Sequence, residues 1–462
     1  MNQRPILGMN MSLSEFMEDQ ASDSSTGIYP LSKLASHEWR NFALYTVENR
    51  AIPNGIDGMK PSQRFYLYSS IKNTSTEFKK VSAVAGVVSG YGYNHGETSA
   101  QGTGQLMAAD WNNNICLIEG RGSFGTRLVQ EAAAARYTYT RLHKNFAKYV
   151  KDLDLAPVHS DPEHEPPAFY VPVIPLVLAN GVKGIATGFA TDILPRDPVD
   201  IARACKEFVE TGKIGKRIKV KYPHFNGKVR FDESENRHYC EGTFEKKSKT
   251  VLLITEVPYG FDREGYIKVL DKLEDEGHIV GYDDLCDKSG FKFEVKLKQQ
   301  TSANWDDEKI RGAFKLVKAH TENLTVIGAD GNLKEYSDER DIVRDFCLFR
   351  NGILDARIKS MQAKLNEEAR WLKVKHQFIE GVLDDLIVFK NQKKDQVGEQ
   401  ILKVTDALDT DIDRLLRLNI SSLTLELVKE LIEEIKKIKK ELTFWNKTTV
   451  KEQFLSDLEE IK

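Results

Sequence analysis

The segment Ala132-Ala-Ala-Ala-Arg136-Tyr137-Thr-Tyr139 sets an arginine beside a tyrosine, directly after a run of small side chains. Small residues let the backbone pack closely, so this run predicts a tightly held segment that ends at Tyr137. The chain has 16 tyrosines, and a single tyrosine usually packs in a core with its hydroxyl hydrogen-bonded. The residues around Tyr137 therefore have to decide between a packing role and a chemical one.

Tyr137 is a candidate nucleophile because cationic side chains lie near it in the sequence. A phenol with a pKa of about 10 is protonated at neutral pH, so its attack on phosphorus needs cations or a base that stabilise developing phenolate. Arg136 is adjacent, and a guanidinium matches the charge and geometry of the non-bridging oxygens of a phosphodiester. Further candidates for phosphate contact are Arg50, Lys60 and Arg64.

Positive charge is concentrated around the same segment. Between residues 121 and 151 the only acidic residue is Glu131, and the cations are Arg121, Arg127, Arg136, Arg141, Lys144, Lys148 and Lys151. A run of charge is usually a solvated face, but this excess of one sign is an uncommon way to build one. A nucleic-acid phosphate backbone is the predicted partner of this basic stripe.

The composition places limits on the rest of the chain. A length of 462 residues with 40% hydrophobic and 29% charged residues is typical of a folded protein of roughly three domains. The net charge of −3 means that any affinity for DNA has to come from local clusters such as the basic stripe. Five scattered cysteines without a C-x-x-C pair predict neither disulfides nor a zinc site and favour a reducing, cytoplasmic location.

The chain divides by composition into an N-terminal extension, a first domain and a β-rich domain. Residues 1–35 are polar and acidic and lack the features of a signal peptide, so we expect a mobile extension. Residues 36–165 alternate short helical patterns with Gly-rich turns, and residues 166–335 are expected to form an α/β domain. Its predicted strands include Lys219–Pro223 and Thr250–Glu256.

The most apolar segment, Val171–Ala190, is interrupted by prolines, glycines and a lysine. A membrane-spanning helix rarely combines these residues, so buried turns and strands are predicted there.

Residues 336–462 are predicted to be helical. Ser337 is the expected N-cap of a long helix, with Asp338 and Glu339 in its first turn. Its apolar positions have the spacing of a coiled coil: Leu354, Ile358, Met361, Leu365, Leu372, Ile379 and Val382. A second amphipathic run, Leu425–Leu442, is expected to return antiparallel, with about Phe389–Ser421 as a cap. Periodicity alone leaves open whether this is a plain bundle or a dimer contact.

Five ordered motifs resemble the cleavage subunits of type II DNA topoisomerases, namely bacterial gyrase A and the ParC subunit of topoisomerase IV. They are Arg50–Arg64, Tyr93–Thr98, Glu119–Gly125, Ala135–Thr138 and Asn180–Thr191. The resemblance extends over about Ser36–Lys462, and the compact length is most similar to the members encoded by T-even-type bacteriophages.

The resemblance implies an α+β multidomain fold. Residues 36–165 would be a winged-helix DNA breakage-reunion domain and residues 166–335 a tower domain. Residues 336–462 would be a long antiparallel coiled coil that ends in a small helical dimer gate. This organisation agrees with the divisions that periodicity and composition predict.

The resemblance also implies roles for single residues. Tyr137 would form a transient 5′-phosphotyrosyl bond and Arg136 would stabilise the transition state, while Arg50, Lys60 and His95 would contact the scissile region. Arg64 is a further expected DNA contact. Each of these cations taken alone is more often a solvated surface residue.

Three more residues are expected to contact DNA. Ile185 would be a wedge inserted between base steps, with a core isoleucine as the alternative. Thr98 would face DNA near a helix N-terminus, and a simple N-cap role explains it nearly as well. Arg121 stands where the bacterial relatives have glutamine, and Tyr93 stands where they have a histidine, so local contacts are expected to differ.

Cofactors are expected on a partner. No Gly-x-x-x-x-Gly-Lys-Ser/Thr loop occurs, and the D-x-D pairs at Asp152/Asp154 and Asp411/Asp413 are interpreted as loop carboxylates. The resemblance implies that Mg²⁺ and ATP bind to a partner that carries the ATPase and metal-binding domains, that the chain dimerises through its C-terminal gate, and that it cleaves double-stranded DNA poorly alone. Because no wrapping domain follows Lys462, relaxation, decatenation and unknotting are expected rather than negative supercoiling.

The sequence leaves two other classes of function open. A tyrosine recombinase or type I enzyme is suggested by the H-x-x-R pattern of His37 and Arg40, although nearly a hundred residues separate Arg40 from Tyr137. A non-catalytic DNA-clamping dimer would need only the basic stripe and the coiled coil.

Overall fold

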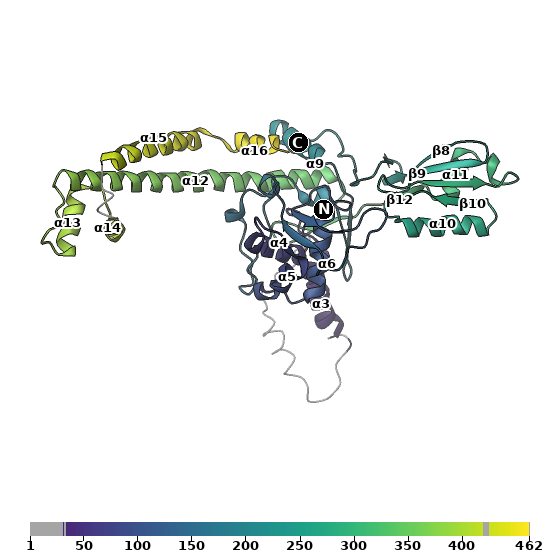
Figure 1. The fold of residues 1–462 in the computed structure, drawn as a ribbon, viewed down its shortest axis with the longest axis horizontal. Helices are drawn as coiled ribbons and strands as arrows, with labels where there is room; N and C mark the ends of the chain where they lie inside the picture. Colours follow the sequence, from purple (N-terminus) through teal and green to yellow (C-terminus); the bar gives the residue numbers. More distant parts are fainter. Residues whose placement is uncertain (1–30, 32–33, 419–424, 462) are drawn as a thin grey trace, which may run out of the picture. The chain divides into compact units, whose positions relative to one another are not determined.

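The computed structural model describes residue 31 and residues 34–418 and 425–461, and the described chain forms two compact units (Figure 1). One unit runs to Arg350 and takes in the last residues from Asp457, and the other is Asn351–Ser456. The expected extension at residues 1–35 lies almost wholly outside the described residues. Among the described residues, no helix is long and apolar enough to cross a membrane.

The N-terminal part of the first unit surrounds a small antiparallel sheet of strand order β1-β3-β2. Its buried core includes Tyr66, Leu67, Val81 and Ile118. The helices are η1 (Leu34–Glu38), α3 (Trp39–Thr46), η2 (Val47–Ala51), α4 (Pro61–Asn73), α5 (Val81–Gly86), η3 (Val88–Tyr91) and α6 (Glu97–Ala108). The strands are β1 (Lys79–Lys80), β2 (Ile118–Arg121) and β3 (Tyr139–Leu142).

A β-hairpin and a bridge connect this core to the rest of the unit. The hairpin pairs β4 (Val182–Ile185) with β5 (Ala190–Ile193), and β13 (Leu324–Ile327) pairs with β14 (Leu333–Tyr336). A single bridge joins Asn54 to Ile327. The intervening helices are α7 (Phe146–Tyr149), η4 (Leu153–Leu155), α8 (Leu176–Asn180) and α9 (Pro198–Thr211). The prediction of buried turns and strands in Val171–Ala190 is confirmed, since α8 is buried and β4 follows it.

Residues 228–320, here called the α/β region, contain two antiparallel sheets of strand order β10-β11-β9-β8 and β12-β7-β6. The strands are β6 (Lys228–Asp232), β7 (Arg237–Glu241), β8 (Thr243–Lys246), β9 (Val251–Glu256), β10 (Ile279–Asp284), β11 (Phe293–Leu297) and β12 (Val317–His320). Helices α10 (Arg263–Asp275) and α11 (Asp307–Ala313) share one buried apolar cluster with the first sheet, and η5 (Ser302–Asn304) precedes α11.

One of the two predicted strands of this region is present. The strand predicted at Thr250–Glu256 is confirmed as β9. The strand predicted at Lys219–Pro223 is wrong, because only Val220 forms a bridge there, with Arg196. The alternation in that segment instead buries Tyr222 against Tyr259, with their rings stacked at 4.2 Å.

Helix α12 (Glu339–Leu383) continues from the first unit into the second, where α13 (Lys394–Val404), α14 (Asp409–Leu416), α15 (Leu425–Lys447) and α16 (Val450–Glu459) follow. In the second unit α15 lies beside α12, joined by the bond from Gln362 to the Trp445 carbonyl (Figure 1). The predicted apolar stripe is buried at Leu354, Leu365 and Ile379. The α13–α14 segment occupies the described part of the predicted cap.

The expected N-cap of α12 is wrong by one residue. The side chain of Asp338, not Ser337, accepts a hydrogen bond from the backbone N–H of Arg340 at 2.8 Å. A carboxylate bonds the free N–H groups of a first helical turn and complements its positive dipole end.

Helices α4 and α6 pack through a glycine. A Cβ built on Gly104 would lie 2.2 Å from the Tyr66 ring, whereas a Cβ on Gly102, in the same helix, would meet nothing within 4 Å. Tyr66 is fully buried, and its hydroxyl is 2.7 Å from that of Thr140 in β3. The missing side chain at Gly104 thus fixes the distance of α6 from α4 and from the sheet.

We expect Gly104→Ala to destabilise the fold by about 1–3 kcal/mol, because the buried ring of Tyr66 has to move. The matched variant Gly102→Ala should be neutral or stabilise by about 0.5–1 kcal/mol, the gain of alanine over glycine in an exposed helix. Urea unfolding of the full chain, followed by circular dichroism, measures both changes. Equal unfolding midpoints for the two variants would contradict this packing.

Candidate functional site

Tyr137 stands in solvent immediately before β3, on a backbone held from several sides. Its N–H donates to the Ala134 carbonyl at 2.8 Å, and the N–H of Val81 donates to the Thr138 carbonyl at 3.0 Å. The side chain is 66% exposed, and no hydrogen bond to its hydroxyl is found within the described part of the chain. A packing role for Tyr137 therefore does not fit its position.

Arg136 lies against the Tyr137 ring. Its guanidinium carbon is 4.9 Å from the ring centroid, and both residues are exposed. A guanidinium in this position keeps the face of the ring in a positive field and leaves its N–H donors toward solvent. Arg136 and Tyr137 can therefore contact one phosphate group together.

A second group of candidates surrounds a groove. The groove has a volume of about 710 Å³ and is bounded by the Arg50–Gln63 motif, by α6 and by the β4–β5 hairpin. The charged or titratable residues that face it include Arg50, Lys60, Lys183, Lys318 and His320. Cations thus outnumber carboxylates along its walls, which suits a polyanion.

Lys60 and Arg50 are brought to this groove by contacts with the hairpin. The ammonium of Lys60 donates to the Lys183 carbonyl at 2.8 Å, and burial lowers the pKa of Lys60. A Cβ on Gly184 would lie 2.0 Å from the carbonyl oxygen of Ala51, next to Arg50, so only glycine allows the hairpin to approach so closely.

His95 lies close to Arg50 and to two aromatic residues. Its Nε2 is 3.1 Å from the hydroxyl of Tyr45, and its ring is 5.5 Å from that of Tyr93. Burial lowers the pKa of His95, and the positive charges of Arg50 and His164 lower it further. The imidazole is therefore a neutral hydrogen-bonding group at physiological pH.

Ile185 and Thr98 occupy exposed positions. Ile185 is 79% exposed at the end of β4, which excludes the core isoleucine alternative. Gly96 is the N-cap residue of α6, so Thr98 lies in the first turn and is not the cap. The roles of both residues in DNA contact stay predictions.

Arg64 and Arg121 are held by contacts within the protein. Arg64 donates to Asp57 at 2.8 Å and to the Met59 carbonyl at 2.7 Å. The exposed Arg121 lies over the rings of Phe78 and Tyr139, at 5.1 and 5.0 Å. Each keeps donors for other contacts, and their expected DNA contacts stay predictions.

Part of the basic stripe has structural partners. Arg127 is buried and donates to Glu256 at 2.9 Å, Arg141 pairs with Glu119 at 2.9 Å, and Lys151 pairs with Asp457 at 2.9 Å. The interpretation of all seven cations as one phosphate-binding face is therefore wrong. The exposed remainder includes Arg121, Arg136, Lys144 and Lys148.

The D-x-D carboxylates are engaged with cations. Asp152 pairs with the fully buried Arg350 at 2.6 Å, and Asp411 with Arg370 at 2.7 Å. Asp411 and Asp413 lie on α14, so the interpretation of this pair as loop carboxylates is wrong. Among the described residues, no group of three His, Cys, Asp or Glu side chains has the arrangement of a metal site.

Tyr137 and the groove residues are not in contact. No hydrogen bond or ion pair joins Tyr137 to Arg50, Lys60 or His95 in the described ranges. Sequence reasoning missed Tyr45, which binds His95, because one tyrosine among 16 carries no signal.

Comparisons with known proteins give one consistent result. A family model for the A-type chain of DNA gyrase/topoisomerase IV matches residues 50–460. The chain is 41% identical over 440 residues to the DNA topoisomerase medium subunit of Enterobacteria phage T4, covering 94% of this chain and 98% of that protein. It is 30% identical over 471 residues to DNA topoisomerase 2 of Plasmodium falciparum, covering 91% of this chain but only 33% of that protein.

A solved structure is similar over nearly the same length. The crystal structure of the Plasmodium falciparum topoisomerase II DNA-binding, cleavage and re-ligation domain matches with a TM-score of 0.84 and 28% identity. The match covers 92% of this chain and 63% of that chain.

We expect His95 to titrate below its ordinary pKa, and Arg50→Gln to raise that pKa toward the ordinary value by removing a nearby positive charge. Histidine-selective NMR of the full chain measures both titrations. Arg121→Gln removes a cation that does not act on His95 and is the matched control. An Arg50→Gln titration that coincides with the wild type would contradict the described geometry.

Proposed function

Because this chain belongs to the gyrase A and topoisomerase IV family of type II DNA topoisomerases, we propose that it is the component that cleaves and rejoins double-stranded DNA. The observation that carries the proposal is the exposed phenol of Tyr137 beside the Arg136 guanidinium. An exposed aromatic hydroxyl with a cation at its side is suited to attack on an external phosphodiester.

The proposed reaction is a reversible transesterification. The Tyr137 oxygen attacks phosphorus, a P–O bond forms, and the bond from phosphorus to the deoxyribose 3′ oxygen breaks. The phenol loses a proton and the released 3′ hydroxyl gains one, so no bond energy is lost. Attack by that hydroxyl on the 5′-phosphotyrosyl bond restores the strand and the phenol.

Arg136 is proposed to stabilise the charge that develops during this exchange. Its planar guanidinium can donate two parallel hydrogen bonds to the non-bridging oxygens. A lysine in its place would keep the charge but lose the paired geometry. Arg136→Lys should therefore retain DNA binding and lose most of the cleavage rate.

The groove is proposed to hold the DNA backbone next to the scissile position. Arg50 and Lys60 supply positive charge, and His95 supplies a neutral donor or acceptor. Ile185 stands free at the end of β4 and is proposed to enter a base step and bend the duplex. Thr98, Arg64 and Arg121 are proposed as further contacts.

The fold supports the same assignment of domains. We identify the β1-β3-β2 sheet with α4, α5 and α6 as the winged-helix cleavage domain and the α/β region as the tower. The paired helices α12 and α15 would be the coiled coil, with α13 and α14 at its end as the dimer gate.

ATP and Mg²⁺ are proposed to bind to a partner subunit. The carboxylates considered for metal binding in this chain are already paired with arginines, so they do not fit a Mg²⁺ site. The similarity to a phage protein named as a medium subunit supports a multi-subunit enzyme. Its proposed activities are relaxation, decatenation and unknotting in the cytoplasm of a host cell.

The deciding experiment compares Tyr137→Phe with Tyr139→Phe in the complex with the partner subunit, Mg²⁺, ATP and supercoiled DNA. Removing the Tyr137 hydroxyl should abolish relaxation and DNA cleavage, while Tyr139→Phe keeps the ring that Arg121 covers and should stay within about twofold of wild type. Full cleavage by Tyr137→Phe would refute the nucleophile. Binding without cleavage by the wild-type complex would favour the DNA-clamping alternative.

We expect Ile185→Ala to reduce the bend of bound DNA, measured by energy transfer between dyes at the ends of a short duplex. Without the wedge, the duplex has to bend smoothly, at a cost of about 1–6 kcal/mol. Val280→Ala changes a similarly exposed apolar residue on β10 and is the control. An unchanged bend angle in Ile185→Ala would contradict the wedge role.

A further inference from the structure

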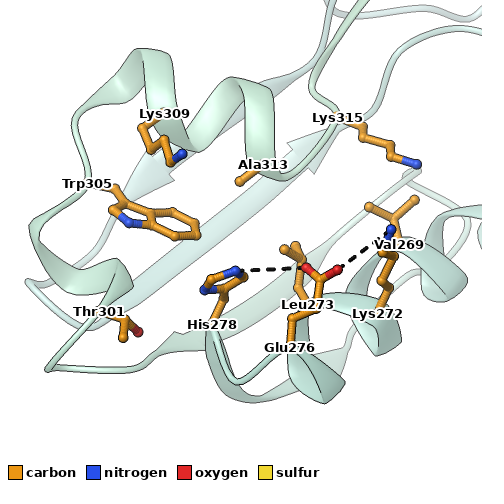
Figure 2. A pocket seen from close by; sticks show the side chains of 10 residues that line it. All are labelled: Val269, Lys272, Leu273, Glu276, His278, Thr301, Trp305, Lys309, Ala313 and Lys315. Atoms are coloured by element: carbon orange, nitrogen blue, oxygen red, sulfur yellow. Dashed lines mark ion pairs between the residues drawn. The ribbon is translucent and has the colours of Figure 1, made fainter.

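The α/β region contains a cavity that the proposed cleavage chemistry does not use. It has a volume of about 450 Å³ and lies between the end of α10, the loop before α11, and α11 itself (Figure 2). Its apolar wall consists of Val269, Leu273 and Ala313, which belong to or pack on the buried cluster of the sheet. This wall is therefore preformed by the core of the region.

One side of the cavity is aromatic. The Trp305 and His278 rings lie 5.1 Å apart with a tilt of 58°, and both face the opening in Figure 2. Trp305 is only partly buried and packs at the edge of the apolar cluster, which fixes its orientation. A planar aromatic surface of this kind can stack with another flat ring.

The other side is cationic. Lys272, Lys309 and Lys315 line the cavity, and Glu276 is the one carboxylate among its lining residues. Glu276 lies 3.6 Å from the Lys272 ammonium and 3.8 Å from His278. In the described part of the chain, Lys309 and Lys315 have no ion-pair partner, so their charges face solvent and the cavity.

Two further observations distinguish this cavity from an ordinary surface hollow. Lys315 adopts a left-handed backbone conformation (φ 48°) at the end of α11, where glycine is the usual residue. The buried Nδ1 of His278 has no hydrogen-bond partner among the described residues. A costly lysine conformation and an unused polar group at the same cavity favour a ligand.

We propose that this cavity binds a nucleotide, with its base against Trp305 and its phosphate at Lys309 and Lys315. An apolar ligand would leave the lysines unused, and a simple anion would leave the aromatic wall unused. A nucleotide has both a flat aromatic ring and a negative group, and the cavity volume lies in the range of small-molecule sites. The nucleotide is either free or one residue of a DNA strand.

The test uses the full chain labelled with ¹⁵N at tryptophan, with Trp305→Phe identifying the Trp305 indole signal. Adenosine 5′-monophosphate and thymidine 5′-monophosphate are titrated without divalent metal. The Trp305 signal should shift in a saturable way, and Lys309→Gln and Lys315→Gln should each weaken the Kd about tenfold, as expected for one charge-assisted hydrogen bond. Lys268→Gln, an exposed lysine of α10 outside the cavity, is the matched control and should leave the Kd unchanged.

Additional probes decide which part of the ligand is recognised. Adenosine and inorganic phosphate should each bind at least tenfold more weakly than the mononucleotides. A short single-stranded oligonucleotide that binds more tightly than the mononucleotide would support the site and identify a strand as the source. Inorganic phosphate that binds as tightly as the mononucleotides, or no Trp305 shift at 10 mM mononucleotide (about the weakest affinity of interest), would overturn the proposal.

Discussion

The site depends on the backbone hydrogen bonds that fix the segment before Tyr137. The N–H of Ser82 donates to the Ala135 carbonyl at 3.3 Å, and the N–H of Ala133 donates to the Ser123 carbonyl at 3.0 Å. The Gln105 side chain of α6 also donates to the Ala133 carbonyl at 2.6 Å. Because a buried backbone is satisfied on both sides, the chain can present Tyr137 and its neighbouring arginine outward without losing order.

The groove depends on a second constraint, the contact of the β4–β5 hairpin with the Arg50–Lys60 motif. The absent side chain of Gly184 and the bond from Lys60 to the Lys183 carbonyl bring together segments more than 120 positions apart. The hairpin that exposes Ile185 is thereby fixed relative to the cations of the groove. Rigid elements that carry the contacting side chains favour a defined path for a stiff duplex.

Sequence reasoning predicted the chemistry at Tyr137 and the helical periodicity of α12, but not the partners of the charged residues. Local patterns determine which face of a helix is apolar, so Leu354, Leu365 and Ile379 were predictable. Ion pairs depend on residues distant in sequence. Arg127 therefore could not be distinguished from Arg136 until Glu256 was seen beside it.

The errors in local structure have similar causes. Val220 alternates like a strand but has no neighbouring strand to extend the single bridge with Arg196. Ser337 and Asp338 are both good N-cap residues, and only the position of the Arg340 N–H decides between them. The exposure of Ile185 likewise follows from the hairpin turn and not from its apolar type.

The most direct measurement of the central claim is the identity of the covalent bond. The complete enzyme complex is denatured during reaction with end-labelled DNA, the DNA–protein adduct is digested with protease, and the linked peptide is sequenced by mass spectrometry. We expect a peptide that contains Tyr137, with a DNA 5′ phosphate on the phenolic oxygen. An adduct on another residue, or a 3′ phosphate linkage, would contradict this assignment.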